Sequence, residues 1–148
     1  MTDRSLSERV EYLSKRRARM LPVLAVIFLS QQVTYFSTVR EYDNVSTVKI
    51  SAWLVLSIVL LAALATKGFW FHSKEIRDLM DDENTRANRN DAMRWGFLVA
   101  MGTAIGIEAL TMFDHVKARE AIHIIMSSGL AVALIRWGYL ERRAHRDG

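Results

Sequence analysis

The sequence predicts an all-α membrane protein: a four-transmembrane-helix bundle, N-in/C-in, with cytoplasmic helical extensions. Three observations predict this fold: four long apolar segments, charged residues confined to the stretches between them, and an excess of Lys and Arg on one side. The chain has 148 residues and is 51% hydrophobic, yet its mean hydropathy is only +0.07 because the 24% of charged residues lie apart from the apolar segments. Such segregation is typical of proteins embedded in a bilayer.

The four predicted spans are residues 21–39, 50–71, 95–113 and 121–140. Each is close to the roughly 20 residues that cross a hydrocarbon core about 30 Å thick. A soluble helical bundle would place polar residues at every third or fourth position, and the segment from Trp53 to Ala65 has no polar face. The first span follows a basic stretch, as in a signal peptide, but the residues from Gln31 to Val33 form no small-residue cleavage site, so we expect this span to be retained.

The connections predict how the chain is oriented. We expect a single integral membrane domain over residues 1–148, with a cytoplasmic arm (1–20), a cytoplasmic connection (72–94) and a cytoplasmic tail (141–148). Sixteen of the 20 Lys and Arg residues lie on the side of the arm, the connection and the tail. Because basic connections stay in the cytoplasm, this asymmetry predicts that both termini are cytoplasmic.

Two helical extensions are expected on the cytoplasmic side. Ser5 and Glu8 fit a capping box that opens an amphipathic helix in the arm, which would lie on the membrane surface with basic residues 15–19 near anionic headgroups. A basic anchor that only sets the topology is an equally good interpretation. In the connection, an apolar stripe at helical spacing continues past the second span, and Thr85 is placed to cap a helix that runs into the third.

An intramembrane polar cluster is predicted near the outer boundary of the spans. Glu108 lies about six positions inside the third span, where a carboxyl is costly to leave facing lipid, so we expect it to point into the bundle. His123, Gln31 and Gln32 lie at a comparable depth and can share a polar cluster with it. We favour a structural hydrogen-bond network over a proton or cation pathway, because no ionisable residue continues the path across the inner half.

Small residues in the third span predict close helix packing. Gly102 and Gly106 form a GxxxG motif, and Gly96 and Ala100 share its spacing of four. Small residues let helix backbones approach closely where no hydrophobic effect drives their association. Because the fourth span has a second small face around Gly129, we expect the third and fourth helices to be in contact. The motif itself fits packing within the chain and packing in a homodimer equally well.

Several chemistries find no support in the sequence. The absence of cysteine excludes disulfides, thiol redox chemistry and thiolate metal sites. The His and Glu residues lack the spacing of a metal site such as His-Glu-x-x-His, and no serine-hydrolase or nucleotide-binding motif is present. We therefore expect no enzymatic activity, no catalytic or metal-binding residue, no cofactor and no direct binding of nucleic acid.

The segment over residues 82–97 resembles one found in small, largely uncharacterised prokaryotic four-span membrane proteins, in which an Asp-Glu-Arg-Thr-like run precedes the third span. The positions that match are Asp82, Glu83, Thr85 and Arg86, whereas Asn84 stands where arginine is usual. Some of these proteins look like partners of very small helix-turn-helix regulators. The resemblance implies a location in the cytoplasmic membrane of a bacterium or archaeon, and membrane sequestration of a transcription regulator.

We therefore expect a non-enzymatic membrane protein that binds a small cytoplasmic protein at its cytoplasmic face. The expected partner-binding residues are an apolar group and a polar rim: Ile76, Leu79, Met80, Asp81, Asp82, Glu83, Thr85, Arg86 and Arg89. The alternatives are a small oligomeric transporter or channel that uses Glu108 and His123, and an accessory subunit of a membrane complex. Small multidrug-resistance transporters share the size and span number, but their essential glutamate is in the first span rather than the third.

Overall fold

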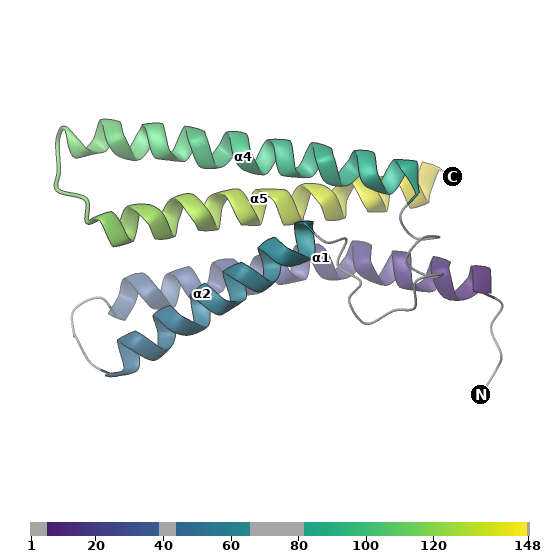
Figure 1. Cartoon of the computed structure of the whole chain (residues 1–148), viewed down its shortest axis with the longest axis horizontal. Coiled ribbons are helices and arrows are strands. Elements are labelled where there is room, and N and C mark those ends of the chain that lie inside the picture. The colour runs from purple at the N-terminus through teal and green to yellow at the C-terminus, as the bar shows by residue number, and fades with distance from the viewer. Residues whose placement is uncertain (1–5, 39–43, 66–81, 148) are drawn as a thin grey trace.

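The computed structural model describes residues 6–38, 44–65 and 82–147, and all regular secondary structure in these ranges is helical (Figure 1). The helices are α1 (Leu6–Thr38), α2 (Asn44–Ala65), α4 (Glu83–Thr111) and α5 (Ala118–Asp147). The all-α prediction is confirmed for this part of the chain. The apolar residues Ile76, Leu79 and Met80 and the acidic Asp81 of the expected binding surface lie outside the described residues.

The helix α5 has the most neighbours. It packs against α4 and α1 and, less extensively, against α2, which also touches α1. In Figure 1, α4 and α5 form an antiparallel hairpin whose turn lies at the same end as the close of α1 and the start of α2. We call this the turn end. The opposite end, where α1 and α4 begin and α5 finishes, is the terminal end.

Three of the described helices are long and apolar enough to cross a membrane, over Val48–Ala65, Glu83–Thr111 and Ala118–Arg146. They correspond to the second, third and fourth predicted spans, so the prediction of four spans is corrected to three candidates among the described residues. The first predicted span is the second half of α1. The side chains of residues 32–38, which complete this span, lie outside the described part of the structure.

The outward faces of the candidate spans are apolar. Val55 and Ile58 on α2 are 61% and 58% exposed, and Phe97 and Ile105 on α4 are 62% and 72% exposed. Soluble proteins rarely present contiguous apolar surface on this scale, because it is unfavourable in water. The same surface is favourable against lipid chains, which is consistent with a membrane location.

Close contact between α4 and α5 depends on Gly96 and Gly129. A Cβ atom on Gly96 would lie 2.7 Å from the Gly129 carbonyl oxygen and 2.8 Å from the Ala133 Cβ. The expected contact between the third and fourth predicted spans is therefore confirmed. The packing role assigned to Gly102 and Gly106 is wrong within the described part of the chain, because both are exposed and no atom beyond their own turns of helix lies within 4 Å of where their Cβ atoms would be.

The helix α1 runs without interruption through Pro22. The expected arm helix is therefore not a separate element on the membrane surface but the first half of α1, in line with the first predicted span. Pro22 has no N–H, so it cannot donate to the Ala18 carbonyl as the fourth residue along an α-helix normally does. Arg142 of α5 supplies the donor instead, with its Nε 3.1 Å from the Ala18 oxygen.

Gly138 lets α5 come close enough for that bond. It precedes Arg142 by one turn, and a Cβ atom on it would lie 2.6 Å from Cδ of Pro22 and 3.2 Å from Cβ of Leu21. The absence of a side chain at Gly138 therefore makes room for the proline ring. This contact sets the distance between α1 and α5 near the terminal end.

Candidate functional site

A buried ion pair joins α1 to α5 at the terminal end. The side chains of Arg17 and Glu141 keep 8% and 3% of their accessible surface, and Nη2 of Arg17 lies 2.5 Å from Oε2 of Glu141. The same nitrogen donates to the Thr85 hydroxyl of α4 at 3.2 Å. The indole N–H of Trp137 donates to the other Glu141 oxygen at 3.1 Å, and the Arg17 guanidinium lies over the Trp137 ring, 5.4 Å from its centroid. These four residues, the Arg17 network, connect three helices.

Local sequence places the members of the Arg17 network. Trp137 and Glu141 are four residues apart on α5, so both side chains lie on one face. On α4, Asp82 is the N-cap residue, and its carboxylate accepts a hydrogen bond from the Thr85 backbone N–H at 2.7 Å. The prediction that Thr85 caps this helix is wrong, because Asp82 already provides a strong cap three residues earlier. Thr85 lies in the first turn instead, and its hydroxyl accepts from Arg17.

A second ion pair links α4 to α5 in a more exposed position. Arg136 Nε lies 2.8 Å from Oδ2 of Asp91, and each side chain is 38% exposed. The guanidinium also lies over the ring of Trp95, 5.6 Å from its centroid. Because water screens such a pair, its contribution to stability is about 1 kcal/mol or less. The Arg17 network, which is nearly free of solvent, therefore has more influence on how the helices are placed.

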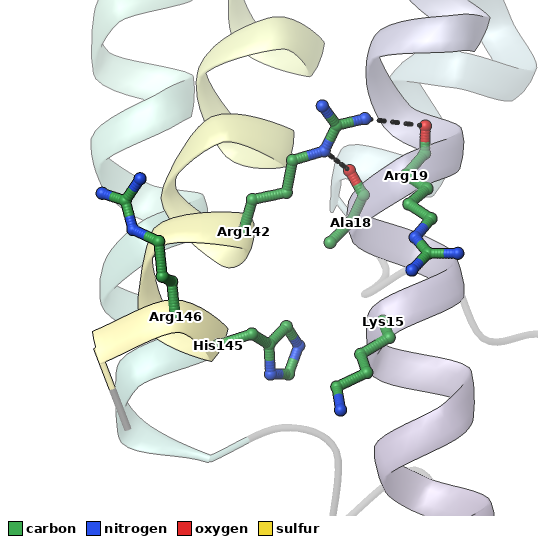
Figure 2. Close-up of a pocket in the computed structure, with 6 residues that line it drawn as sticks. All are labelled: Lys15, Ala18, Arg19, Arg142, His145 and Arg146. Carbon is green, nitrogen blue, oxygen red and sulfur yellow. Dashed lines mark hydrogen bonds between the residues drawn. The ribbon is translucent and has the colours of Figure 1, made fainter.

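A basic groove lies between α1 and α5 at the terminal end (Figure 2). Figure 2 shows Arg142 reaching across to the α1 backbone, where its Nη2 also lies 3.4 Å from the Arg19 carbonyl oxygen. Nε2 of His145 lies 2.9 Å from the hydroxyl of Ser14. The residues that line the basic groove are Lys15, Ala18, Arg19, Arg142, His145 and Arg146.

One exposed carboxylate lies beside the basic groove. Nζ of Lys15 is 2.5 Å from Oε1 of Glu11, one turn earlier on α1. The hydrogen bond and the charge of Lys15 lower the pKa of Glu11 below its usual value of 4.5. Glu11 therefore stays ionised at neutral pH and offsets part of the charge of Lys15.

The predicted intramembrane cluster does not form as expected. Glu108 is exposed on α4. His123 is buried on α5, and the centroid of its ring lies 4.0 Å from the centroid of the Trp53 ring on α2. Gln31 is partly buried, and the side chain of Gln32 lies outside the described part of the structure. The reason is the rotation of α4 about its axis: Ile107 faces inward, and the next residue points about 100° away.

The expected partner-binding residues within the described ranges have different surroundings. Glu83 and Arg86 are exposed on the first turn of α4, and Arg89 is partly buried. Asp82 is exposed but serves as the N-cap. Thr85 is buried, with 7% of its surface accessible, so its place in the expected binding rim is wrong: it belongs to the Arg17 network.

Sequence reasoning missed Arg17, Trp137 and Glu141. One signal was present, because Glu141 is a lone acidic residue within a basic segment and follows a tryptophan by one helical turn. Among the described residues, no group of three or more His, Cys, Asp or Glu side chains is placed to hold a metal ion.

Comparisons with protein-family models, curated proteins and solved structures find no match to this chain. Its function is therefore inferred from the geometry of its own residues. Two features of the terminal end are relevant: a buried junction of three helices, and a basic groove beside it.

Proposed function

We propose that this chain is a non-enzymatic, multi-pass protein of a bacterial or archaeal cytoplasmic membrane, and that its terminal end binds a small cytoplasmic protein. The observation that carries the proposal is the buried Arg17 network, which joins α1 to the start of α4 and to the last third of α5. A preorganised surface binds a partner with less loss of conformational entropy than a mobile one. The terminal end therefore has the properties expected of a binding platform.

The distribution of charge supports a cytoplasmic location for the terminal end. Of the 15 Lys and Arg residues in the described ranges, 12 lie toward this end and 3 at the turn end. Positive charge next to membrane spans is retained on the cytoplasmic side. This arrangement favours the orientation with both termini inside.

The proposed contact surface begins at the first turn of α4. Glu83 and Arg86 are exposed there and would form part of a polar rim around apolar residues of the preceding connection. The resemblance of residues 82–97 to the small prokaryotic membrane proteins suggests the class of partner, a very small helix-turn-helix regulator. Binding at this surface would hold such a regulator at the membrane.

The transport alternative has less support from the described residues. Glu108 is exposed on α4 rather than enclosed with His123, so one copy of the chain does not surround it with polar groups. A transport path through Glu108 would require several copies that meet on this face of α4. An accessory role in a larger membrane complex could use the same face.

Reporter fusions test the insertion and the orientation. Alkaline phosphatase, which folds only outside the cytoplasm, should be inactive when fused after Gly148 and active when inserted near Asn44. The chain should also stay in the membrane fraction after an alkaline carbonate wash. The reverse pattern of phosphatase activity would overturn the orientation, and release by carbonate would overturn the membrane assignment.

A charge swap tests the binding platform. In the variant Glu83→Lys/Arg86→Glu two exposed charges are exchanged, while the net charge and the Asp82 cap are retained. The parent protein, purified in mild detergent, should bind a soluble helix-turn-helix protein from its own cells, and both the swap and added salt should weaken this binding.

The matched control is the swap Arg119→Glu/Glu120→Lys at the turn end, which should leave binding unchanged. The platform proposal is wrong if the parent binds no soluble partner, or if the Glu83 and Arg86 swap binds the same partner as strongly as the parent.

A further inference from the structure

We propose that the basic groove binds the phosphate of an anionic phospholipid headgroup. This inference rests on the membrane insertion in the proposed function but concerns a different ligand from the protein partner. Four of the lining residues carry a positive charge, namely Lys15, Arg19, Arg142 and Arg146, and none of the lining residues is acidic.

Two carboxylates that neighbour groove residues, Glu11 and Glu141, do not themselves line the groove. Glu11 pairs with Lys15 on the exposed face of α1, where it offsets one charge. Glu141 is adjacent to Arg142 in sequence, but its carboxylate points into the protein and is neutralised by the buried Arg17. The residues that line the groove therefore carry a net positive charge, which favours an anion.

Two groove side chains are already held in position. Arg142 is held by the Ala18 carbonyl, which lacks its helical donor because residue 22 is proline. His145 is held by Ser14 across the groove. Arginine binds phosphate through charge-assisted hydrogen bonds, and a side chain that is already positioned loses less conformational entropy on binding.

The surroundings of the groove favour a lipid over a free phosphate ion. Arg19 is followed along α1 by the exposed apolar residues Val23 and Val26, which begin about 6 Å further along the helix axis. On α5, Ile135 and Tyr139 are 44% and 55% exposed just before Arg142. A headgroup in the groove would leave its acyl chains beside this apolar surface, and basic residues next to a membrane span are typical partners of anionic headgroups.

A titration of the purified full chain in non-ionic detergent tests the proposal. Three probes are compared: short-chain phosphatidylglycerol, the matching phosphatidylcholine, and inorganic phosphate. Phosphatidylglycerol should raise the melting temperature, with half-saturation at a concentration about tenfold lower than phosphatidylcholine requires, and inorganic phosphate should have no effect at that concentration.

Two double variants test whether the effect of phosphatidylglycerol on the melting temperature arises in the groove. Arg19→Gln/Arg146→Gln removes two groove charges and should weaken the phosphatidylglycerol response about tenfold. Arg16→Gln/Arg94→Gln removes the same charge from exposed positions outside the groove and should behave as the parent. Melting without lipid shows whether each variant is folded, and Arg19→Gln alone, with a smaller loss in the same direction, replaces the double variant if the latter does not fold.

Several results would overturn the proposal. Equal responses to the two lipids, or equal losses in groove and control variants, would show that no headgroup site exists in the groove. Protection by inorganic phosphate, with competition against the lipid, would indicate a free-anion site instead. A chain that stays in the membrane after carbonate but shows no lipid preference contradicts only this inference, whereas a chain released by carbonate contradicts the proposed function as well.

Discussion

The two ends of the α4 and α5 hairpin both carry charged and polar residues but use them differently. At the terminal end, Arg17 and Glu141 are buried and join three helices through side-chain contacts. At the turn end, the hydrogen bonds of the last turn of α4 and the following loop are local: the Thr111 hydroxyl donates to the Glu108 carbonyl at 2.6 Å, and the His115 N–H donates to the Asp114 carboxylate at 2.7 Å. The comparison teaches that a charged residue determines helix placement only where packing removes it from solvent.

The free energy of burying a charge explains why the buried and the exposed charged residues differ in their effect on stability. Burying two charges carries a large desolvation cost, which the ion pair and its hydrogen bonds must offset. Removing one charged side chain leaves the other charge buried, so its desolvation cost is no longer offset by the ion pair. Exposed charges at the turn end remain solvated, so their loss changes little.

The largest expected effect is at the Arg17 network. Arg17→Met leaves the Glu141 carboxylate buried without its cation and should lower the free energy of unfolding by about 3–5 kcal/mol. Denaturant titration of the protein in detergent micelles measures this loss. Arg119→Met, an exposed arginine at the turn end, should change the free energy by about 0.5 kcal/mol or less.

A double variant checks that the loss comes from the uncompensated charge. Arg17→Met/Glu141→Gln removes both charges and should be more stable than Arg17→Met alone. A double variant at least as unstable as the single one would show that Arg17 acts through packing rather than through its pairing with Glu141.

The second prediction compares two glycines on α4. Gly96→Ala would place its Cβ against the Gly129 carbonyl and should destabilise the protein by about 1–3 kcal/mol, since the helices must move apart. Gly102→Ala meets open space and should stabilise by about 0.5–1 kcal/mol through its higher helix propensity. The same unfolding titration measures both, and equal effects would contradict the observed rotation of α4.

The third prediction concerns the bond from Arg142 to the Ala18 carbonyl. Arg142→Met should cost about 1 kcal/mol, the usual contribution of one hydrogen bond. Pro22→Ala restores the helical donor to that carbonyl, so Arg142→Met should cost less in the Pro22→Ala background. A double-mutant cycle measures the difference, and additive effects would show that Arg142 does not compensate for the proline.

The smallest expected effect is that of Glu11→Gln. Lys15 lowers the pKa of Glu11 in the folded state, so this carboxylate contributes stability above its unfolded pKa and loses it as the pH falls through the folded pKa. Because the Glu11 side chain is 61% exposed, melting curves of the variant and the parent recorded from neutral to acidic pH should coincide within error. A clear divergence in the acidic range would show that the exposed pair affects stability more than its solvation predicts.

Sequence alone determined the helical class, three of the four predicted spans and the concentration of basic residues toward one end. These properties depend on local composition: an apolar run of sufficient length forms a helix and favours lipid wherever it lies in the fold. The expected contact between the helices now called α4 and α5 also followed, because each carries small residues at helical spacing.

Only the tertiary structure decided which residues of each kind lie inside. Sequence spacing selected Glu108, Gly102 and Gly106, and all three face outward. The contacts are made instead by Arg17 with Glu141, which the sequence did not single out, and by Gly96 with Gly129, which it named only as members of the small faces. Successive side chains on a helix differ by about 100° in direction, so the choice between them depends on the rotation of each helix and its alignment with its neighbour, which packing of the whole protein sets.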